Sequence, residues 1–273
     1  MSAFRTIEIS DARVEGLRFV TVKSRALAGR ADLTVFMPRE AENKSGVPLV
    51  ILLHGVYGSH WGWALSGNAH RTVQRLIASG QIPPLALAMP SDGLWGDGSG
   101  YVPHASQNFE KWIVEEVPLA AVEAMPAVSE SSPLFICGLS MGGFGALRLA
   151  AKHPGRFRAV SGHSSITHFE QLKQFVEEPL YLYPVEAGDV SVLETMVRNR
   201  ASLPPIRFDC GTEDPLLKDN RELHLELERQ GIAHRYEEFP GGHEWKYWER
   251  HLEDSLRFFA EVGLGALRRP RRV

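Results

Sequence analysis

The 273-residue chain contains little cysteine and shows no excess of either charge. Its two cysteines, Cys137 and Cys210, are too few for a disulfide-dense scaffold or for a zinc site built from cysteines. The 30 Lys and Arg residues nearly balance the 33 Asp and Glu residues, so the formal net charge is −3. We therefore expect no nucleic-acid partner. The one basic cluster, residues 268–272, is interpreted as a solvated tail.

Long apolar runs are missing too, because no stretch reaches the roughly 18 residues that a membrane-spanning helix needs. No apolar run follows the first five residues, Met1 to Arg5, so no signal peptide is predicted. We therefore expect no membrane partner and a cytoplasmic location. Repeats and low-complexity linkers are also missing, which predicts a single domain over residues 1–273.

Short apolar runs alternate with longer stretches that have helical periodicity. Continuous apolar runs are typical of parallel strands that are buried on both faces of a sheet. We expect strands at residues 17–23, 32–37, 47–53, 84–89, 134–137, 157–161, 206–210 and 234–239. We expect helices at residues 68–78, 109–125, 141–152, 216–230 and 244–262. This order predicts an α/β fold with a mostly parallel central sheet, an antiparallel N-terminal start and helices on both faces.

Ligands bind such sheets at the carboxyl ends of the strands, and a serine motif occurs at one of these ends. Residues 138–142 read Gly-Leu-Ser-Met-Gly, which is G-x-S-x-G between an expected strand and an expected helix. The glycines leave room for a tight turn, and the start of the helix places free N–H groups beside Ser140. We predict Ser140 as a nucleophile. The alternative is a glycine-rich turn with a helix-capping serine.

A serine nucleophile needs a base that takes its proton and an acid that orients the base. Two later strand ends carry such residues in the required chain order, namely Asp214 and then His243. We predict His243 as the general base and Asp214 as its partner. Glu213 and Asp209 compete for the role of the acid, and the sequence leaves them as alternatives. His54 and His163 also follow expected strands and are weaker candidates for the base.

Acyl transfer also needs two N–H donors that stabilise the oxyanion of the tetrahedral intermediate. We predict the backbone N–H of Met141, directly after the nucleophile, as one donor. The other should come from the loop that follows the expected strand 47–53. We predict the N–H of Val56, with Tyr57 as the second choice. An ordinary glycine turn is the alternative for this loop.

Taken together, these motifs resemble the esterase D family of α/β-hydrolases. The resemblance rests on Leu-Leu-His-Gly at 52–55, Met-Pro-Ser-Asp-Gly at 89–93, Gly-Leu-Ser-Met-Gly-Gly at 138–143, Gly-Thr-Glu-Asp at 211–214 and Gly-Gly-His at 241–243. That family includes S-formylglutathione hydrolases, antigen 85-type mycolyltransferases and feruloyl esterases, and the chain looks closest to its small tributyrin-type esterases.

The resemblance implies an α/β-hydrolase fold, the triad Ser140, Asp214 and His243, and oxyanion donors at Val56 and Met141. It implies a serine carboxylesterase that acts on small-molecule, short-chain acyl esters and needs no cofactor and no metal. Two alternatives remain open within enzymes, an S-formylglutathione hydrolase-like thioesterase and an acyltransferase. A non-catalytic binding protein of the same fold is an alternative of another class, and assembly into a homo-oligomer is left open.

Two segments are expected to surround the site. Loop 91–101 carries two aspartates among glycines, so a metal site, a shaped structural loop and a pocket wall are weighed for it. As substrate-binding candidates we single out Tyr57, Trp61, Trp95 and Tyr101, with packing as the alternative. Segment 164–200 is long for a connection between neighbouring strands and is predicted to form a partial cap.

Overall fold

The computed structural model describes residues 4, 6–11, 14, 16–104 and 106–263, so the basic cluster at 268–272 lies outside the described residues. The strands are β1 (Ile7–Asp11), β2 (Leu17–Ser24), β3 (Gly29–Phe36), β4 (Leu49–Leu53), β5 (Ala86–Pro90), β6 (Pro103–His104), β7 (Gln107–Asn108), β8 (Leu134–Leu139), β9 (Val160–His163), β10 (Ile206–Gly211) and β11 (Arg235–Phe239). Strands β6 and β7 form a small separate hairpin.

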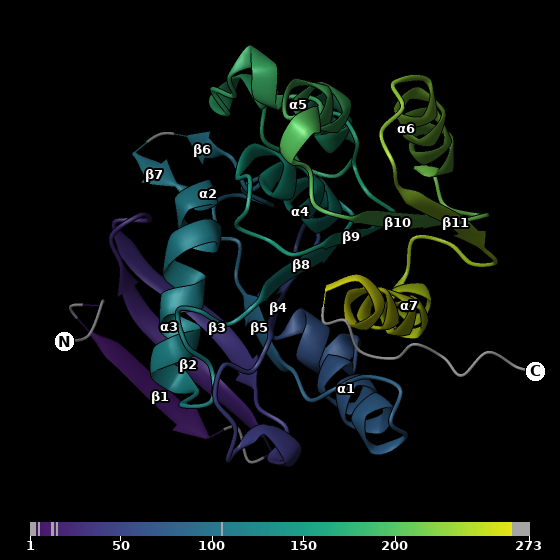
Figure 1. The fold of residues 1–273 in the computed structure, drawn as a ribbon. Coiled ribbons are helices and arrows are strands. Elements are labelled where there is room, and N and C mark those ends of the chain that lie inside the picture. The colour runs from purple at the N-terminus through teal and green to yellow at the C-terminus, as the bar shows by residue number, and fades with distance from the viewer. Residues whose placement is uncertain (1–3, 5, 12–13, 15, 105, 264–273) are drawn as a thin grey trace, which may run out of the picture.

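The other strands form one sheet across the described part of the chain, in the order β1-β2-β3-β5-β4-β8-β9-β10-β11 (Figure 1). The pairs from β1 to β5 are antiparallel, and the pairs from β5 to β11 are parallel. The predicted fold class, a mostly parallel sheet with an antiparallel N-terminal start, is therefore confirmed.

Helices cover both faces of this sheet (Figure 1). They are α1 (Ala69–Ala78), α2 (Phe109–Lys111), α3 (Val117–Ala124), α4 (Met141–Lys152), α5 (Val192–Arg198), α6 (Leu217–Arg229) and α7 (Trp245–Gly263). Helices α1 and α7 lie on one face, and α3 and α4 lie on the other. Within the described ranges, no helix is long and apolar enough to cross a membrane.

The sequence of strand β4 is continuously apolar and does not alternate between apolar and polar residues. Its side chains point to opposite faces in turn, as in any strand. Leu49, Ile51 and Leu53 belong to the core under α3 and α4. Val50 and Leu52 belong to the core under α1 and α7. Because both faces are covered, every position of the strand is buried and every position is apolar.

The predicted helix 109–125 is wrong in its middle. A wide π-helical turn, Trp112–Glu116, separates α2 from α3. Pro118 lacks the N–H that a regular helix would donate to the carbonyl of Val114. The guanidinium of Arg156 donates to this carbonyl instead, at 3.0 and 2.7 Å. The expectation for the strand at 157–161 is also shifted, because Phe157 packs into the core before β9 begins at Val160.

Strand β1, helix α5 and the short strands β6 and β7 were not predicted at all. Strand β1 is an edge strand whose residues are mostly exposed, so it has no apolar run to indicate it. Helix α5 has seven residues and lies inside segment 164–200. Its start is capped by the side chain of Ser191, which accepts from the N–H of Glu194 at 3.2 Å. All of these elements are too short or too exposed for a periodic pattern to reveal them.

Segment 164–200, predicted as a partial cap, consists of 3-10 turns at Phe169–Gln174, Leu180–Leu182 and Ala187–Asp189 together with α5. A buried ion network attaches it to α4. The fully buried guanidinium of Arg148 lies 2.8 Å from Glu110 and 3.5 Å from Asp189. Lys152 pairs with the same two carboxylates. The segment is thereby held on the helix that follows Ser140.

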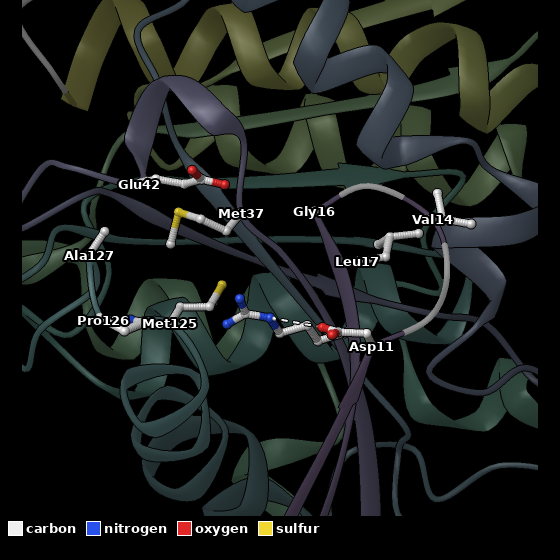
Figure 2. Close-up of a pocket in the computed structure, with 10 residues that line it drawn as sticks. Asp11, Val14, Gly16, Leu17, Met37, Glu42, Met125, Pro126 and Ala127 are labelled. Carbon is white, nitrogen blue, oxygen red and sulfur yellow. Dashed lines mark ion pairs between the residues drawn. The ribbon is translucent and has the colours of Figure 1, made fainter.

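A cavity of about 460 Å³ opens at the other end of the sheet. Among the residues around it, Arg18 and Asp11 form an ion pair at 3.5 Å (Figure 2). The cavity lies beside the end of β3, where Phe36 pairs with Leu87 near the beginning of β5. This is the amino end of the parallel strands. The described residues that line the cavity include none of the predicted site residues.

Candidate active site

Ser140 lies on a tight turn between β8 and α4. Its φ of 54° and ψ of −119° are unusual for a residue with a side chain, and this strain is typical of a nucleophile elbow. A Cβ atom on Gly138 would lie 2.0 Å from the carbonyl oxygen of Gly142. A Cβ atom on Gly142 would lie 2.4 Å from the carbonyl oxygen of Leu53. Both positions therefore require glycine.

The three predicted triad residues form one line of hydrogen bonds. The Nε2 atom of His243 lies 3.0 Å from the Oγ atom of Ser140. The Nδ1 atom of His243 lies 2.8 Å from Oδ2 of Asp214. The carboxylate of Asp214 is fully buried, and its other oxygen accepts the N–H of Leu216 at 2.8 Å. The imidazole remains 19% exposed, which leaves it reachable from solvent.

Two neighbouring loops bring Asp214 and His243 together. The strands before them, β10 and β11, pair in parallel, so both loops leave the same edge of the sheet. Backbone hydrogen bonds then join the loops. Thr212 donates to Phe239 at 2.8 Å, and Glu213 donates to Gly241 at 3.0 Å. The side chain that points inward from this pair of loops is Asp214, whereas Glu213 is exposed.

The competing acid and bases lie elsewhere. Asp209 pairs with the imidazole of His163 at 2.8 Å, and both side chains are fully buried. The Nε2 atom of that imidazole lies 2.9 Å from the Oγ atom of Ser255. This is a second serine, histidine and aspartate group, but Ser255 has no exposed surface and a substrate has no access to it. His54 is the first residue of the loop that follows β4, and its side chain is buried.

The loop after β4 lies directly beside the nucleophile. A Cβ atom on Gly55 would lie 3.2 Å from the Cβ atom of Ser140. The N–H of Tyr57 donates to the carbonyl of Asp97 at 2.9 Å, so this group is already used. The N–H groups of Val56 and Met141 have no hydrogen-bond partner among the described residues. These are the two N–H groups that the sequence analysis predicts as oxyanion donors, and they are free in this arrangement of the described residues, whereas the N–H of the alternative, Tyr57, is not.

His54 orients the peptide that carries the Val56 donor. Its Nδ1 atom lies 2.6 Å from the carbonyl oxygen of Gly55, and its Nε2 atom accepts the N–H of Asp92 at 3.0 Å. These partners place the ring proton on Nδ1. In a trans peptide the carbonyl and the N–H point in opposite directions. The Val56 N–H therefore points away from His54.

The predicted pocket residues occupy different environments. Tyr57 and Trp61 are 65% and 42% exposed near the loop after β4. Trp95 is half-buried and packs edge-on against Tyr183, with ring centroids 4.7 Å apart. Tyr101 is fully buried, and its hydroxyl donates to the carbonyl of His54 at 3.0 Å. The prediction that Tyr101 lines the substrate pocket is therefore wrong, because its side chain has no exposed surface.

Loop 91–101 is organised by Asp92. One carboxylate oxygen of this buried residue accepts the N–H of Leu94 at 2.9 Å, and the other accepts the N–H of Ser99 at 2.6 Å. The hydroxyl of Ser99 donates back to the carbonyl of Asp92 at 2.9 Å. These contacts favour the shaped structural loop over a metal site. Among the described residues, no group of three or more His, Cys, Asp or Glu side chains could hold a metal ion.

Two aromatic side chains enclose the imidazole of His243. Phe175, in segment 164–200, stacks on it with centroids 5.5 Å apart and planes at 20°. Trp248, in α7, meets it edge-on at 5.0 Å and 90°. The sequence analysis did not connect either residue with His243. Packing alone would explain an aromatic residue at either position, so no local signal singles them out.

Comparisons with known proteins give the family of the chain. Residues 24–259 match the Esterase family, which is described as "Putative esterase". An acetyl esterase from Caldicellulosiruptor saccharolyticus is 25% identical over 230 residues, covering 77% of this chain and 82% of that protein. An S-formylglutathione hydrolase from Paracoccus denitrificans is 24% identical over 259 residues, covering 88% of this chain and 91% of that protein. The solved structure of a ferulic acid esterase superposes with a TM-score of 0.76 at 24% identity, covering 90% of this chain and 98% of that chain.

The mixed sheet and the serine on its elbow turn define a serine hydrolase with the α/β-hydrolase fold. Within that class, the chain belongs to the Esterase family, whose match spans most of its length. It is an enzyme that hydrolyses carboxylic esters. The resemblance to the esterase D family is thereby confirmed.

Proposed function

We propose that this esterase hydrolyses short-chain acyl esters through an acyl-enzyme intermediate on Ser140, without a cofactor or metal. The hydrogen-bonded line from Ser140 through His243 to Asp214 carries the proposal. It supplies both a nucleophile and a base, which are the groups that ester cleavage requires. The acetyl esterase among the relatives supports a small acyl group.

In the first half of the reaction, Nε2 of His243 takes the proton of Ser140 as Oγ attacks the carbonyl carbon of the ester. The carbonyl oxygen becomes an oxyanion and accepts from the N–H groups of Val56 and Met141. The carboxylate of Asp214 stabilises the imidazolium that forms. When the tetrahedral intermediate collapses, the imidazolium donates its proton to the departing alcohol and the acyl group remains on Oγ.

Water completes the cycle in the second half. His243 accepts a proton from a water molecule, which attacks the acyl carbon, and the same two N–H groups receive the second oxyanion. Collapse returns the proton to Oγ of Ser140 and releases the carboxylic acid. The exposed fraction of the His243 ring supports direct entry of water. Access of water favours hydrolysis over transfer to another acceptor.

The packing beside the proposed donors supports a small acyl group. A Cβ atom on Gly98 would lie 2.5 Å from the sulfur of Met141 and 3.2 Å from Cγ1 of Val56. Loop 91–101 therefore closes tightly against both donor residues. Phe175 stacks on the ring of His243. From these contacts we expect little room for a long acyl chain next to the oxyanion.

The second candidate is an S-formylglutathione hydrolase. The relative from Paracoccus denitrificans favours it, since it covers most of both chains. The same serine, base and oxyanion donors would cleave a thioester, and a formyl group would fit the same acyl space. The two candidates differ in the leaving group, which is a thiol in one and an alcohol in the other.

A substrate panel separates the candidates. We would measure kcat/KM for p-nitrophenyl esters from two to twelve carbons, for S-formylglutathione, and for acetylated and feruloylated sugars. The proposal expects the highest values at two to four carbons and a low value for the thioester. A maximum at eight or more carbons would contradict it, and a maximum for S-formylglutathione would favour the second candidate. The cytoplasmic location and the oligomeric state stay predictions, to be tested by fractionation and light scattering.

A further inference from the structure

Asp97 lies between two segments that are far apart in sequence. On one side, its carbonyl oxygen accepts the N–H of Tyr57 at 2.9 Å, and its Oδ2 atom accepts the hydroxyl of Tyr57 at 3.1 Å. On the other side, Oδ2 accepts the N–H of Glu177 at 2.7 Å. The N–H of Asp97 donates to Oε1 of Glu178 at 3.1 Å. These contacts join the loop after β4 to segment 164–200.

Tyr57 depends on these contacts for its conformation. Its φ of 55° lies in the left-handed region, which is unfavourable for a residue with a side chain. Its side chain is 65% exposed, so packing contributes little to holding it. Within the described residues, the hydrogen bonds of Tyr57 all go to Asp97. The hydrogen bond to Asp97 also raises the pKa of Tyr57, which keeps the hydroxyl protonated as a donor.

The residue directly before Tyr57 is Val56, the proposed oxyanion donor. The loop around Val56 is held from both sides, by His54 at the carbonyl of Gly55 and by Asp97 at the N–H and the hydroxyl of Tyr57. Preorganised donors stabilise an oxyanion without any cost of reorientation during the reaction. If one side is released, the loop can relax from its strained conformation and the Val56 N–H loses its direction.

Asp97 also contacts the segment that packs on His243, the proposed general base. Glu177, whose N–H donates to Oδ2, follows Phe175 by two residues, and the ring of Phe175 stacks on His243. Loop 91–101 and segment 164–200 are also in close contact at Gly96, where a Cβ atom would lie 2.4 Å from the carboxylate of Glu178. One carboxylate therefore connects the oxyanion loop with the segment that covers the base.

We propose that Asp97 is a positioning residue for ester hydrolysis. Its carboxylate holds the oxyanion loop through Tyr57 and sets that loop against the part of segment 164–200 that covers His243. Asp97 acts through these neighbours and not on the substrate. The inference rests on the proposed roles of Ser140 and Val56. Its consequence is that Asp97 contributes to stabilising the transition state and little to binding the ground state.

The test is a set of variants assayed with p-nitrophenyl acetate. Asp97→Ala should lower kcat about tenfold with KM changed less than about threefold, because the donor is displaced and not removed. The inhibition constant of n-butylboronic acid, whose serine adduct mimics the tetrahedral intermediate, should rise by a similar factor. Asp97→Asn should restore kcat to within about threefold, since its amide oxygen can accept both hydrogen bonds. Thermal unfolding of each variant reports folding.

Two further variants test whether Asp97 acts through the hydroxyl of Tyr57. Tyr57→Phe removes only one exposed hydroxyl and should reproduce most of the loss, and adding it to Asp97→Ala should cause little further loss. Glu177→Ala removes a nearby charge but keeps the backbone N–H, so it should leave kcat unchanged. The proposal is overturned if Tyr57→Phe keeps wild-type kcat, if Asp97→Ala raises KM alone, or if Asp97→Asn is as slow as Asp97→Ala. Should Asp97→Ala fail to fold, Tyr57→Phe decides.

Wild type and Ser140→Ala are assayed beside these variants. An inactive wild type, or an active Ser140→Ala, would mean that the proposed function fails. An active wild type with an inactive Ser140→Ala, together with a fully active Asp97→Ala, would mean that only the positioning role fails. The two failures are therefore distinguishable.

Discussion

The backbone N–H of Ser140 donates to the carbonyl oxygen of His163 at 2.9 Å. The imidazole of His163 is in turn paired with the carboxylate of Asp209 at 2.8 Å, and the hydroxyl of Tyr247 donates to that carboxylate at 2.7 Å. The elbow turn is thus attached to the end of β9 by a residue whose own side chain is anchored in the core. Burial alone would lower the pKa of His163, but the charge of Asp209 outweighs it and raises the pKa to about 10.

Replacing His163 with Gln should lower the free energy of unfolding at pH 7 by about 3 kcal/mol, because a buried charge pair loses one partner. The pKa of His163 in the unfolded state is about 6.5, and because its pKa in the folded state is higher, protonation of His163 stabilises the fold fully below about pH 6.5. This stabilisation is lost as the pH rises through the pKa of the folded state. The difference between wild type and His163→Gln should therefore narrow from pH 7 to pH 10. Urea unfolding across this range measures it, and a widening difference would contradict the assignment.

Replacing Ser140 with Ala should abolish nearly all esterase activity and leave the fold intact. The residual rate would come from the oxyanion donors and from substrate binding alone. A fluorophosphonate should label Ser140 in the wild type, and the buried Ser255 serves as the internal control that stays unlabelled. More than a tenth of the wild-type rate in Ser140→Ala, with unchanged circular dichroism, would rule out Ser140 as the nucleophile.

Replacing Asp214 with Asn should lower kcat by a factor on the order of 10⁴, because the imidazole loses the carboxylate that orients it. Glu213→Gln is the matched control, since that side chain is exposed and lies one residue away. It should leave kcat within about threefold of wild type. The opposite ranking of the two variants in steady-state kinetics would transfer the role of the acid to Glu213.

Stability at low pH should depend on Glu110, the carboxylate under α4. Burial would raise its pKa, but the hydrogen bond with His153 and the charges of Arg148 and Lys152 bring it to about 2 from 4.5. Because the pKa of Glu110 is lower in the folded state than in the unfolded state, its ionised carboxylate stabilises the fold at any pH above its unfolded-state pKa. This stabilisation is lost as the pH falls toward 2. Wild type should lose about 3 kcal/mol from this group over that interval, and Glu110→Gln should not. Parallel acid-unfolding curves for the two proteins would refute this expectation.

Activity should not depend on a metal ion. The carboxylate oxygens of Asp92 already accept N–H groups of their own loop, and the triad supplies nucleophile and base. Dialysis against EDTA should leave kcat/KM unchanged, with a known zinc hydrolase treated in parallel as the positive control. A loss that calcium or zinc restores would show that loop 91–101 holds a metal.

The sequence alone determined most strands of the sheet, the elbow and the order of the proposed catalytic side chains, because these depend on local patterns. Strands that are buried on both faces are continuously apolar. Ser140 follows such a strand directly, and Asp214 and His243 come a few residues after the ends of β10 and of its edge neighbour β11. Only the tertiary structure decided which N–H the oxyanion loop leaves free. The N–H of Tyr57 is used by Asp97, forty residues away, and no periodic pattern links the two.

The same reason explains the error at Tyr101 and the contacts that sequence analysis missed. Its position after β5 indicates the active-site edge of the sheet, but the direction of its side chain depends on packing against Gly145 in α4. The stacking of Phe175 on His243 likewise joins two elements that meet only in the folded chain. Strand ends are placed by local hydrophobic periodicity, whereas the orientation of side chains around them is decided by neighbours that the fold brings from elsewhere in the sequence.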